Sequence, residues 1–432
     1  MKLRALHLLA AFTAVILFSN IVSFNTKNNK YSESYPAVVC APNQNGQTSA
    51  ISLASSKTLV RKTGTSTLIF KESRTRRFSG TSQATVIDSQ AITPLSWQVR
   101  TGVWAGGLTC ISPITSEWFV GGSADLTSKG TLTLVNSGLG KALVGVTVYN
   151  ENGEQAQQLF AVRANSFKSM QLGSLAPGSK ALAIHVTPET GRINAFVTDE
   201  RGRGLQALGG DTVNSASEAA KVIVIPAIPH QSGNRGSAPH ILRILIPGEV
   251  GSQINVEIKS TDGTFSPAGI DGRLIPAGKV IEIPLDVVMP NGKFALLISA
   301  ERPLIASVFT KLISSGKSDF LWSTSAPVLQ PSSYAVTGLA PLLVFTGEKF
   351  AIDIDLTPMQ GKKRSIRVTG DQIATYQVSD RISSFTVTKI SDGVYGAALI
   401  SSKSGFGYAP LVAGSVLTRT SIPRSNIRVL IP

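Results

Sequence analysis

Two similar stretches that start 110 residues apart, VTVYNENG (Val146 to Gly153) and VEIKSTDG (Val256 to Gly263), decide the fold prediction. Each reads as a β-strand that runs into a turn, because β-branched residues lead to Asn-Gly or Asp-Gly. Their matched neighbours are TLTLVN at Thr131 with LRILIP at Leu242, and ALAIHV at Ala181 with FALLIS at Phe294. Strands matched in one order predict an all-β chain of tandem immunoglobulin-like β-sandwich domains, each of ~100 residues.

The repeat divides the 432-residue chain into five predicted parts. Residues 1–26 are an export segment, and residues 27–115 are a β-rich lead-in region closed by a disulfide. Three sandwich repeats follow at residues 116–220, 221–325 and 326–432, of which the third is shorter and fainter. Stretches of small and polar residues or Pro, such as Gly209 to Ala220 and Ser323 to Ser333, suggest linkers between repeats.

The N-terminal segment predicts export across a membrane. Lys2 and Arg4 precede a stretch from Ala5 to Thr26 that contains no Asp, Glu, Lys or Arg. This stretch reaches the ~20 residues that span a bilayer as a helix. We expect an uncleaved signal-anchor that holds the remainder outside the cytoplasm. Secretion after cleavage is the alternative, although Ile21 and Ser23 make a poor cleavage site.

The chain has two cysteines, Cys40 and Cys110. An even number of cysteines in an exported chain favours one disulfide, and two separate buried thiols are the alternative. A tetrahedral metal site is disfavoured, because neither cysteine has a histidine close by in the sequence.

The composition is basic, with 41 Lys and Arg against 26 Asp and Glu. A net charge of +15 attracts polyanions. Because the charge is dispersed and the chain exported, we expect no nucleic acid partner; anionic lipid or an anionic wall polymer fits better. Candidate contacts with an anionic surface lie nearest the anchor, in the cluster Lys71, Arg74, Arg76 and Arg77. A second cluster is Lys362 to Arg364. A solvated loop without a partner stays an alternative for both.

Four stretches together resemble a family of actinobacterial exported proteins of unknown function, anchored in the cell envelope. They are Cys110 followed by EWFVG, TLTLVNSG leading to VTVYNENG, DERGRGLQALGGD from Asp199 followed by IPAIP, and DGTFSPAG from Asp262 followed by IPAG. These stretches cover about two thirds of the chain. The resemblance implies a cell-envelope location and a β-rich exterior, and it supplies no catalytic residues.

No catalytic, cofactor or metal site is expected. The four histidines stand apart from acidic or Cys partners, and the sequence contains no G-x-S-x-G, H-E-x-x-H or Walker A motif. A charged, glycine-rich segment is the remaining candidate: an ion pair fixing a domain-joining loop, or an interaction loop. Its charged members are Asp199, Glu200, Arg201, Arg203 and Asp211.

These observations predict a non-catalytic envelope protein, a structural or protein-interaction scaffold whose protein partners are unknown. A binding module for an anionic wall polymer or glycan is the alternative, and it requires exposed aromatic side chains. Trp97, Trp104, Trp118 and Trp322 are the only tryptophans, and their burial discriminates between the two hypotheses. A hydrolase with an unfamiliar site is a third and weaker hypothesis.

Overall fold

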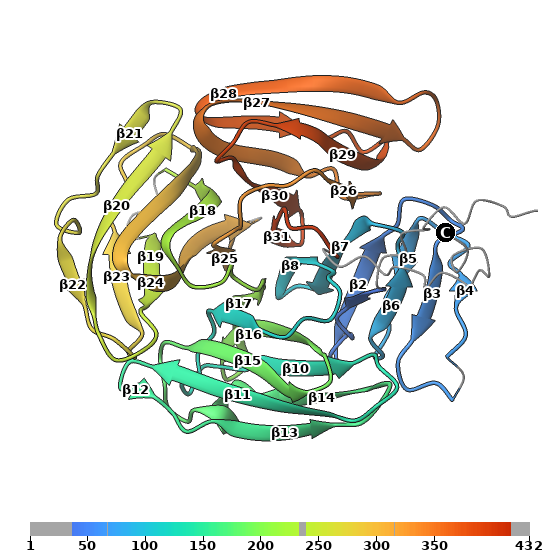
Figure 1. Cartoon of the computed structure of the whole chain (residues 1–432), viewed down its shortest axis with the longest axis horizontal. Helices are drawn as coiled ribbons and strands as arrows, with labels where there is room; N and C mark the ends of the chain where they lie inside the picture. The colour runs from blue at the N-terminus through green and yellow to red at the C-terminus, as the bar shows by residue number, and fades with distance from the viewer. Residues whose placement is uncertain (1–36, 67, 233–238, 315, 416–432) are drawn as a thin grey trace, which may run out of the picture. The chain divides into compact units, whose positions relative to one another are not determined.

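The computed structural model describes residues 37–66, 68–232, 239–314 and 316–415 (Figure 1). The predicted export segment lies outside these residues. Within them the protein is all-β, and the single helix is the four-residue α2 (Leu172–Leu175). No helix in this part of the chain is long and apolar enough to cross a membrane.

Residues 38–109 form eight strands, although the sequence predicted only a weakly patterned lead-in there. They are β1 (Val38–Cys40), β2 (Gln47–Ser52), β3 (Leu59–Lys62), β4 (Lys71–Glu72), β5 (Arg77–Ser79), β6 (Thr85–Asp88), β7 (Ile92–Arg100) and β8 (Trp104–Thr109). One sheet has the order β1-β6-β3-β4, and the other pairs β5-β2-β7-β8. The strands of this set are short, which explains why their alternation is faint in the sequence.

The next set repeats this pairing order with longer strands. It comprises β9 (Glu117–Val120), β10 (Thr131–Asn136), β11 (Ala142–Asn150), β12 (Gly153–Glu154), β13 (Gln158–Val162), β14 (Ser166–Gln171), β15 (Ala183–Thr190), β16 (Asn194–Arg203) and β17 (Gln206–Val213). Its sheets are β12-β11-β15-β9, with β13 also on β11, and β14-β10-β16-β17. Inward residues of both sheets, such as Leu132 and Val146, share one apolar core.

A third set has the same order. It comprises β18 (Ala220–His230), β19 (His240–Leu245), β20 (Ser252–Ser260), β21 (Gly263–Phe265), β22 (Arg273–Ile275), β23 (Ile281–Leu285), β24 (Gly292–Ser314) and β25 (Lys317–Thr324). The long β24 pairs first with β20 and then with β19, so it serves both sheets. The two stretches that opened the prediction form equivalent hairpins, with Asn150 opposite Gly153 and Ser260 opposite Gly263.

Among the described residues, the fourth set has fewer strands than the other three, and two of them, β27 and β28, are long. It comprises β26 (Ser332–Ala335), β27 (Leu342–Pro358), β28 (Arg364–Gln377), β29 (Ile382–Ile390), β30 (Tyr395–Ser402) and β31 (Gly405–Pro410). The first half of β27 pairs with β30, and its second half pairs with β29. The same pairing order therefore occurs four times between residues 38 and 410.

This strand order differs from the expected immunoglobulin-like one. In the first set the first strand, β1, lies beside β6, and β7 lies beside β2; in the second set β9 lies beside β15, and β16 lies beside β10. In an immunoglobulin domain the first strand pairs with the second, and the seventh with the sixth. A repeat of turn-punctuated strands is compatible with both orders, so the sequence pattern alone does not separate them.

The last strands of the four sets, β8, β17, β25 and β31, contact one another in cyclic order (Figure 1). One hydrogen bond illustrates each junction. Thr212 donates to the Gly107 carbonyl at 2.7 Å, the Trp322 backbone amide to Asp211 at 2.7 Å, Tyr408 to the Thr324 carbonyl at 2.7 Å, and Thr109 to the Pro410 carbonyl at 3.1 Å. The strands thus form a closed ring, and β7 also pairs in parallel with β26 to join the first set to the fourth.

Candidate functional site

The predicted interaction segment, Asp199 to Asp211, belongs to the ring. It forms the end of β16, a turn at Arg203 to Gln206, and most of β17. Asp199 and Asp211 are fully buried and Glu200 is 5% exposed. Arg203 alone among the charged members is exposed. Arg203 is thus the exposed charge of this segment, and the structural alternative, an ion pair that fixes the segment, fits the three buried carboxyl groups.

Asp199 is held by an ion pair and an indole. The Arg201 guanidinium lies 2.9 Å from its Oδ2, and the Trp322 indole N–H donates to the same oxygen at 2.9 Å. Burial on its own lowers the pKa of a guanidinium, yet the Asp199 carboxylate raises the pKa of Arg201 overall. The Arg201 guanidinium also covers the rings of Phe309 and Phe320, at 4.9 and 5.0 Å. These contacts join the second set to the third.

Glu200 joins the second set to the first in the same way. Both of its carboxylate oxygens accept from Arg100, at 2.5 and 2.6 Å, and Oε2 accepts from the Trp104 indole at 2.9 Å. Because Trp104 is fully buried, its indole N–H needs such a partner.

Asp211 and Asp319 place two further carboxyl groups among the ring strands. Asp211 accepts the backbone amides of Trp322 and Thr212, and Asp319 accepts those of Gly210 and Phe320. Burial raises the pKa of Asp319 to about 7 and that of Asp211 well above its ordinary value. Each carboxyl group accepts main-chain amides from two neighbouring sets, so both act as cross-links rather than as groups aimed into a cleft.

Sequence reasoning missed the most deeply buried cation. Arg243 in β19 is 1% exposed, and it donates to Glu282 at 2.6 Å and to the Gly122 carbonyl at 2.6 Å. Its guanidinium lies 4.6 Å from the ring centroid of Trp322. One charge inside the apolar strand HILRILIP was the available signal, since such a charge needs a buried partner.

The histidines that the sequence set aside contact one another or the core. His230 and His240 share a hydrogen bond of 2.9 Å between ring nitrogens. His185 stacks on Trp118 with ring centroids 3.8 Å apart, and its Nε2 lies 3.1 Å from Ser116 Oγ. In the described part of the chain, no group of three or more His, Cys, Asp or Glu side chains is placed to hold a metal ion.

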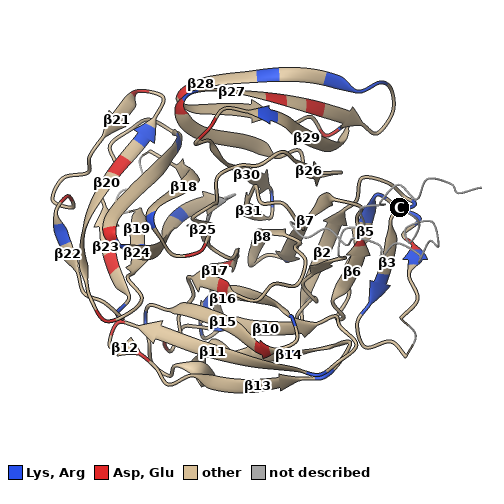
Figure 2. Cartoon of the chain, in the orientation of Figure 1, with Lys and Arg blue, Asp and Glu red and all other residues tan. Residues whose placement is uncertain are grey.

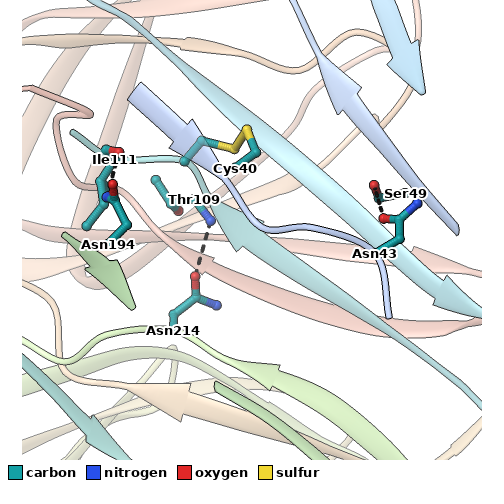
Figure 3. Close-up of a disulfide and its surroundings, with 8 residues drawn as sticks. Cys40, Asn43, Ser49, Thr109, Ile111, Asn194 and Asn214 are labelled. Atoms are coloured by element: carbon teal, nitrogen blue, oxygen red, sulfur yellow. Dashed lines mark hydrogen bonds between the residues drawn. A yellow bond between two sulfur atoms is a disulfide. The ribbon is translucent and has the colours of Figure 1, made fainter. Parts of the chain in front are cut away.

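The disulfide prediction is confirmed. Cys40 at the end of β1 bonds Cys110 just after β8, with Cα atoms 4.8 Å apart (Figure 3). Both neighbours of Cys110 are held by the second set. The Thr109 backbone amide donates to Asn214 at 3.2 Å, and the Asn194 side chain donates to the Ile111 carbonyl at 3.0 Å (Figure 3). The disulfide therefore closes the first set at the point where the chain enters the second.

The predicted anionic-surface contacts lie on β4, β5 and the turn between them (Figure 2). Lys71, Arg74 and Arg77 are exposed, and Arg76 is half-buried because it donates to the Met359 carbonyl at 2.8 Å. Arg61, a basic residue nearby in the sequence, instead binds Asn165 and the Ser137 carbonyl of the second set. Figure 2 also shows basic segments on β28, the strand that begins at Arg364.

A comparison with models of known protein families assigns the chain to a family. A model described as "Family of unknown function (DUF5719)" matches residues 78–378. The chain belongs to the DUF5719 family. The family match runs from β5 through β28, so it contains the whole second and third sets and most of the charged ring residues.

The other comparisons add no function to this DUF5719 chain. No curated protein matches it. Among solved structures, "Crystal Structure of Thermotoga maritima 1070" is similar, with 16% identity, 24% of this chain and 96% of that chain covered, and a TM-score of 0.21. A likeness at this TM-score supports no argument about fold or function.

Proposed function

We propose that this DUF5719 chain is a non-catalytic protein of the cell envelope, outside the cytoplasm, that serves as a rigid structural or protein-interaction scaffold. The observation that carries the proposal is the use made of the ring's charged groups. Asp199, Glu200, Asp211, Asp319 and Arg243 all bind other sets of strands. Groups used as internal cross-links fix the relative position of the first three sets, which is what a scaffold requires.

The proposed location rests on the uncharged stretch Ala5 to Thr26, on the disulfide, and on the resemblance to exported actinobacterial proteins. A disulfide persists in oxidising compartments and is rare in the cytosol. We propose that the N-terminal segment remains as a membrane anchor.

The location is tested by alkylating thiols in intact cells before lysis. We expect Cys40 and Cys110 to resist alkylation until a reductant is added, and an externally added protease to reach the protein once the outer layers are opened. Reduced thiols together with protection from the protease would overturn the proposed location.

Burial of the tryptophans favours the scaffold over the glycan-binding alternative. Trp104 and Trp322 are fully buried, and Trp97 and Trp118 are each 6% exposed. A sugar ring stacks on an exposed aromatic face, and none of the four offers one. Binding to an anionic polymer or surface then depends on the basic side chains alone.

The scaffold role is tested by photo-crosslinking in cells from exposed positions. Leu205 and Leu126 are fully exposed on adjacent loops, joined by a bond of 2.8 Å from the Gly202 amide to the Thr127 carbonyl. We expect discrete protein adducts from one of the exposed faces, with Leu159 on β13 as the comparison position (57% exposed). Absence of adducts from every exposed position would contradict the scaffold role.

A further inference from the structure

The two basic clusters, 285 residues apart in the sequence, meet across the junction of the first and fourth sets. Arg76 on the β4–β5 turn donates to the carbonyl of Met359 at 2.8 Å. Met359 begins the β27–β28 hairpin turn, which carries Lys362 and Lys363 and leads into Arg364 at the start of β28. On the other side, the Met359 amide donates to the Arg381 carbonyl at 2.8 Å. The Met359 backbone thus contacts Arg76 of the first set through its carbonyl and Arg381 of its own set through its amide.

The resulting surface is strongly basic. We name it the basic junction surface; it comprises Lys57, Lys71, Arg74, Arg76, Arg77, Lys362, Lys363, Arg364 and Arg381. Lys57 belongs to it because its neighbours Ser56 and Thr58 accept the amides of Arg74 and Ser73, at 2.8 and 2.9 Å. Glu72 and Asp380 are the exposed acidic side chains on these same turns, so cations greatly outnumber anions.

Four lysines of this surface are not engaged by other groups of the described part of the chain. Among the described residues, the side chains of Lys57, Lys71, Lys362 and Lys363 make no hydrogen bond or ion pair, and all four are exposed. Like charges gathered on two adjoining turns repel one another, and the two acidic side chains on these turns, Glu72 and Asp380, offset only part of that repulsion. The arrangement suits an external partner of opposite charge.

The end of the molecule at which the surface lies favours a membrane as that partner. β1 begins at Val38, opposite Ile87, and the adjoining strands bring Lys71 to the same level through Val60. In the sheet order β1-β6-β3-β4, the strand carrying Lys71 lies ~14 Å from β1. In the sequence, residues 27–37 separate the start of β1 from the uncharged stretch Ala5 to Thr26.

Apolar side chains among the cations support a lipid surface over a hydrophilic polymer. Met359 and Leu59 are each 36% exposed beside Arg76 and Glu72. Apolar residues rimmed by Lys and Arg enter the headgroup layer of anionic membranes, where charge and burial act together.

We propose that the basic junction surface binds the anionic lipid headgroups of the membrane to which the N-terminal segment directs the chain. This inference depends on the proposed envelope role, and it adds the surface through which the protein contacts the membrane. Binding in a purified system does not depend on the location test above, so the two can fail separately.

The experiment measures binding of the full chain to vesicles of phosphatidylcholine, with and without one third phosphatidylglycerol. The uncharged N-terminal stretch contributes to binding of both kinds of vesicle. Its contribution therefore cancels in the ratio of the two affinities. Lys57→Glu/Lys71→Glu changes the first-set half of the surface, and Lys362→Glu/Lys363→Glu the fourth-set half. Arg273→Glu/Lys279→Glu is the matched control, because both residues are exposed on the third set and the charge change is equal.

A cation at an anionic membrane contributes about fivefold in affinity. We expect each surface double variant to lower the anionic-to-neutral ratio at least tenfold, the quadruple variant more, and the control less than threefold. Added salt should weaken wild-type binding, because surface attraction is screened. Near-ultraviolet circular dichroism verifies that the variants fold.

Three results would overturn the proposal. One is equal loss in the control and surface variants, which reports net charge alone. Another is an anionic-to-neutral ratio near one for the wild type. The third is binding to soluble polyglutamate as strong as to anionic vesicles, which would assign the surface to an anionic polymer.

Discussion

At the scale of single residues, Arg243 shows how one buried charge joins two sets of strands. Its guanidinium donates to Glu282 in its own set and to the carbonyls of Gly122 and Leu182 in the preceding one. Arg243→Met keeps much of the apolar stem but leaves the buried Gly122 carbonyl without its donor, and the Leu182 carbonyl keeps the Gly121 amide alone. We expect the free energy of unfolding to fall by ~3 kcal/mol, measured by urea denaturation.

Glu282→Gln is the comparison, because the Glu282 side chain is 37% exposed and water can replace part of its interaction. It should cost ~1–2 kcal/mol, because an amide oxygen still accepts from Arg243 but leaves the buried guanidinium without a counter-charge. Similar losses in both variants would mean that the ion pair, and not the buried carbonyls, determines the cost.

Buried carboxyl groups predict an unusual pH dependence of stability. Burial raises the pKa of Glu117 to about 8, although the Ala195 amide donates to it, and raises that of Asp319 to about 7. In the unfolded chain both groups lose their protons near their ordinary values, 4.5 and 3.8. Between those limits the folded state holds more protons, so the free energy of unfolding falls as pH rises, by about 1 kcal/mol per pH unit for each group.

The prediction is checked by urea denaturation between pH 6.5 and pH 8, above the range in which His185 and His240, whose pKa values burial lowers to about 4 and about 3, act in the opposite direction. Glu117→Gln resembles the protonated carboxyl group at every pH, so this variant should lose less stability over the same interval than the wild type. A wild-type protein that becomes more stable from pH 6.5 to pH 8 would contradict the raised pKa values of these carboxyl groups.

At the scale of the elements, the disulfide stabilises the set with the shortest strands. β1, β4 and β5 have three, two and three residues, so each contributes few ladder bonds. Closing a loop of 70 residues stabilises by about 4 kcal/mol in the chain-entropy treatment. Replacing both cysteines by serine should therefore lower stability by ~2–5 kcal/mol.

Urea denaturation with and without a thiol reductant measures this contribution. The reductant should destabilise the wild type and leave the double serine variant unchanged. Equal midpoints for the oxidised and reduced wild type would show that the disulfide adds nothing to the first set.

At the scale of the whole described unit, glycines allow the ring to close between its first and last strands. A Cβ on Gly407 of β31 would lie 2.4 Å from the Gly107 amide nitrogen of β8 and 2.6 Å from the Trp97 ring. Those groups are backbone and a buried indole, so neither can move aside cheaply. Gly407→Ala should lower the free energy of unfolding by ~2 kcal/mol or more.

Gly173→Ala in α2 is the control, because a Cβ there meets no atom within 4 Å. It should be neutral or slightly stabilising, since alanine favours a helix over glycine. If both substitutions have equal effects on thermal unfolding, the close approach of β8 and β31 does not limit stability.

The sequence predicted the all-β fold class because the signals for strands and turns come from residues that are neighbours in the chain. The hairpins at Asn150 to Gly153 and Ser260 to Gly263 follow from turn chemistry, and they gave the repeat its register. The first set was missed as a copy because its strands are too short to show alternation. The immunoglobulin-like order was wrong because neighbours in a sheet depend on contacts between strands far apart in the chain.

For the candidate site, the sequence found the charged residues and the tertiary structure decided their use. Asp199 to Asp211 is charged and glycine-rich, which is typical of an exposed turn, yet three of its carboxylates are buried against neighbouring sets. Their partners, Arg100, Trp104 and Trp322, are remote in sequence. A buried ion pair and a solvated one have the same local sequence, so burial is known only from the fold.

By itself, the sequence determined that this protein is built of repeated strands and where its basic clusters lie in the chain, and it favoured the pairing of Cys40 with Cys110. Only the tertiary structure decided that four sets close into a ring and that Arg76 and Met359 bring two of those clusters together. The physical reason is the distance along the chain over which each property acts. Propensity, turn chemistry and charge are properties of neighbours in the chain, whereas burial and contact between sets depend on which distant surfaces pack against each other.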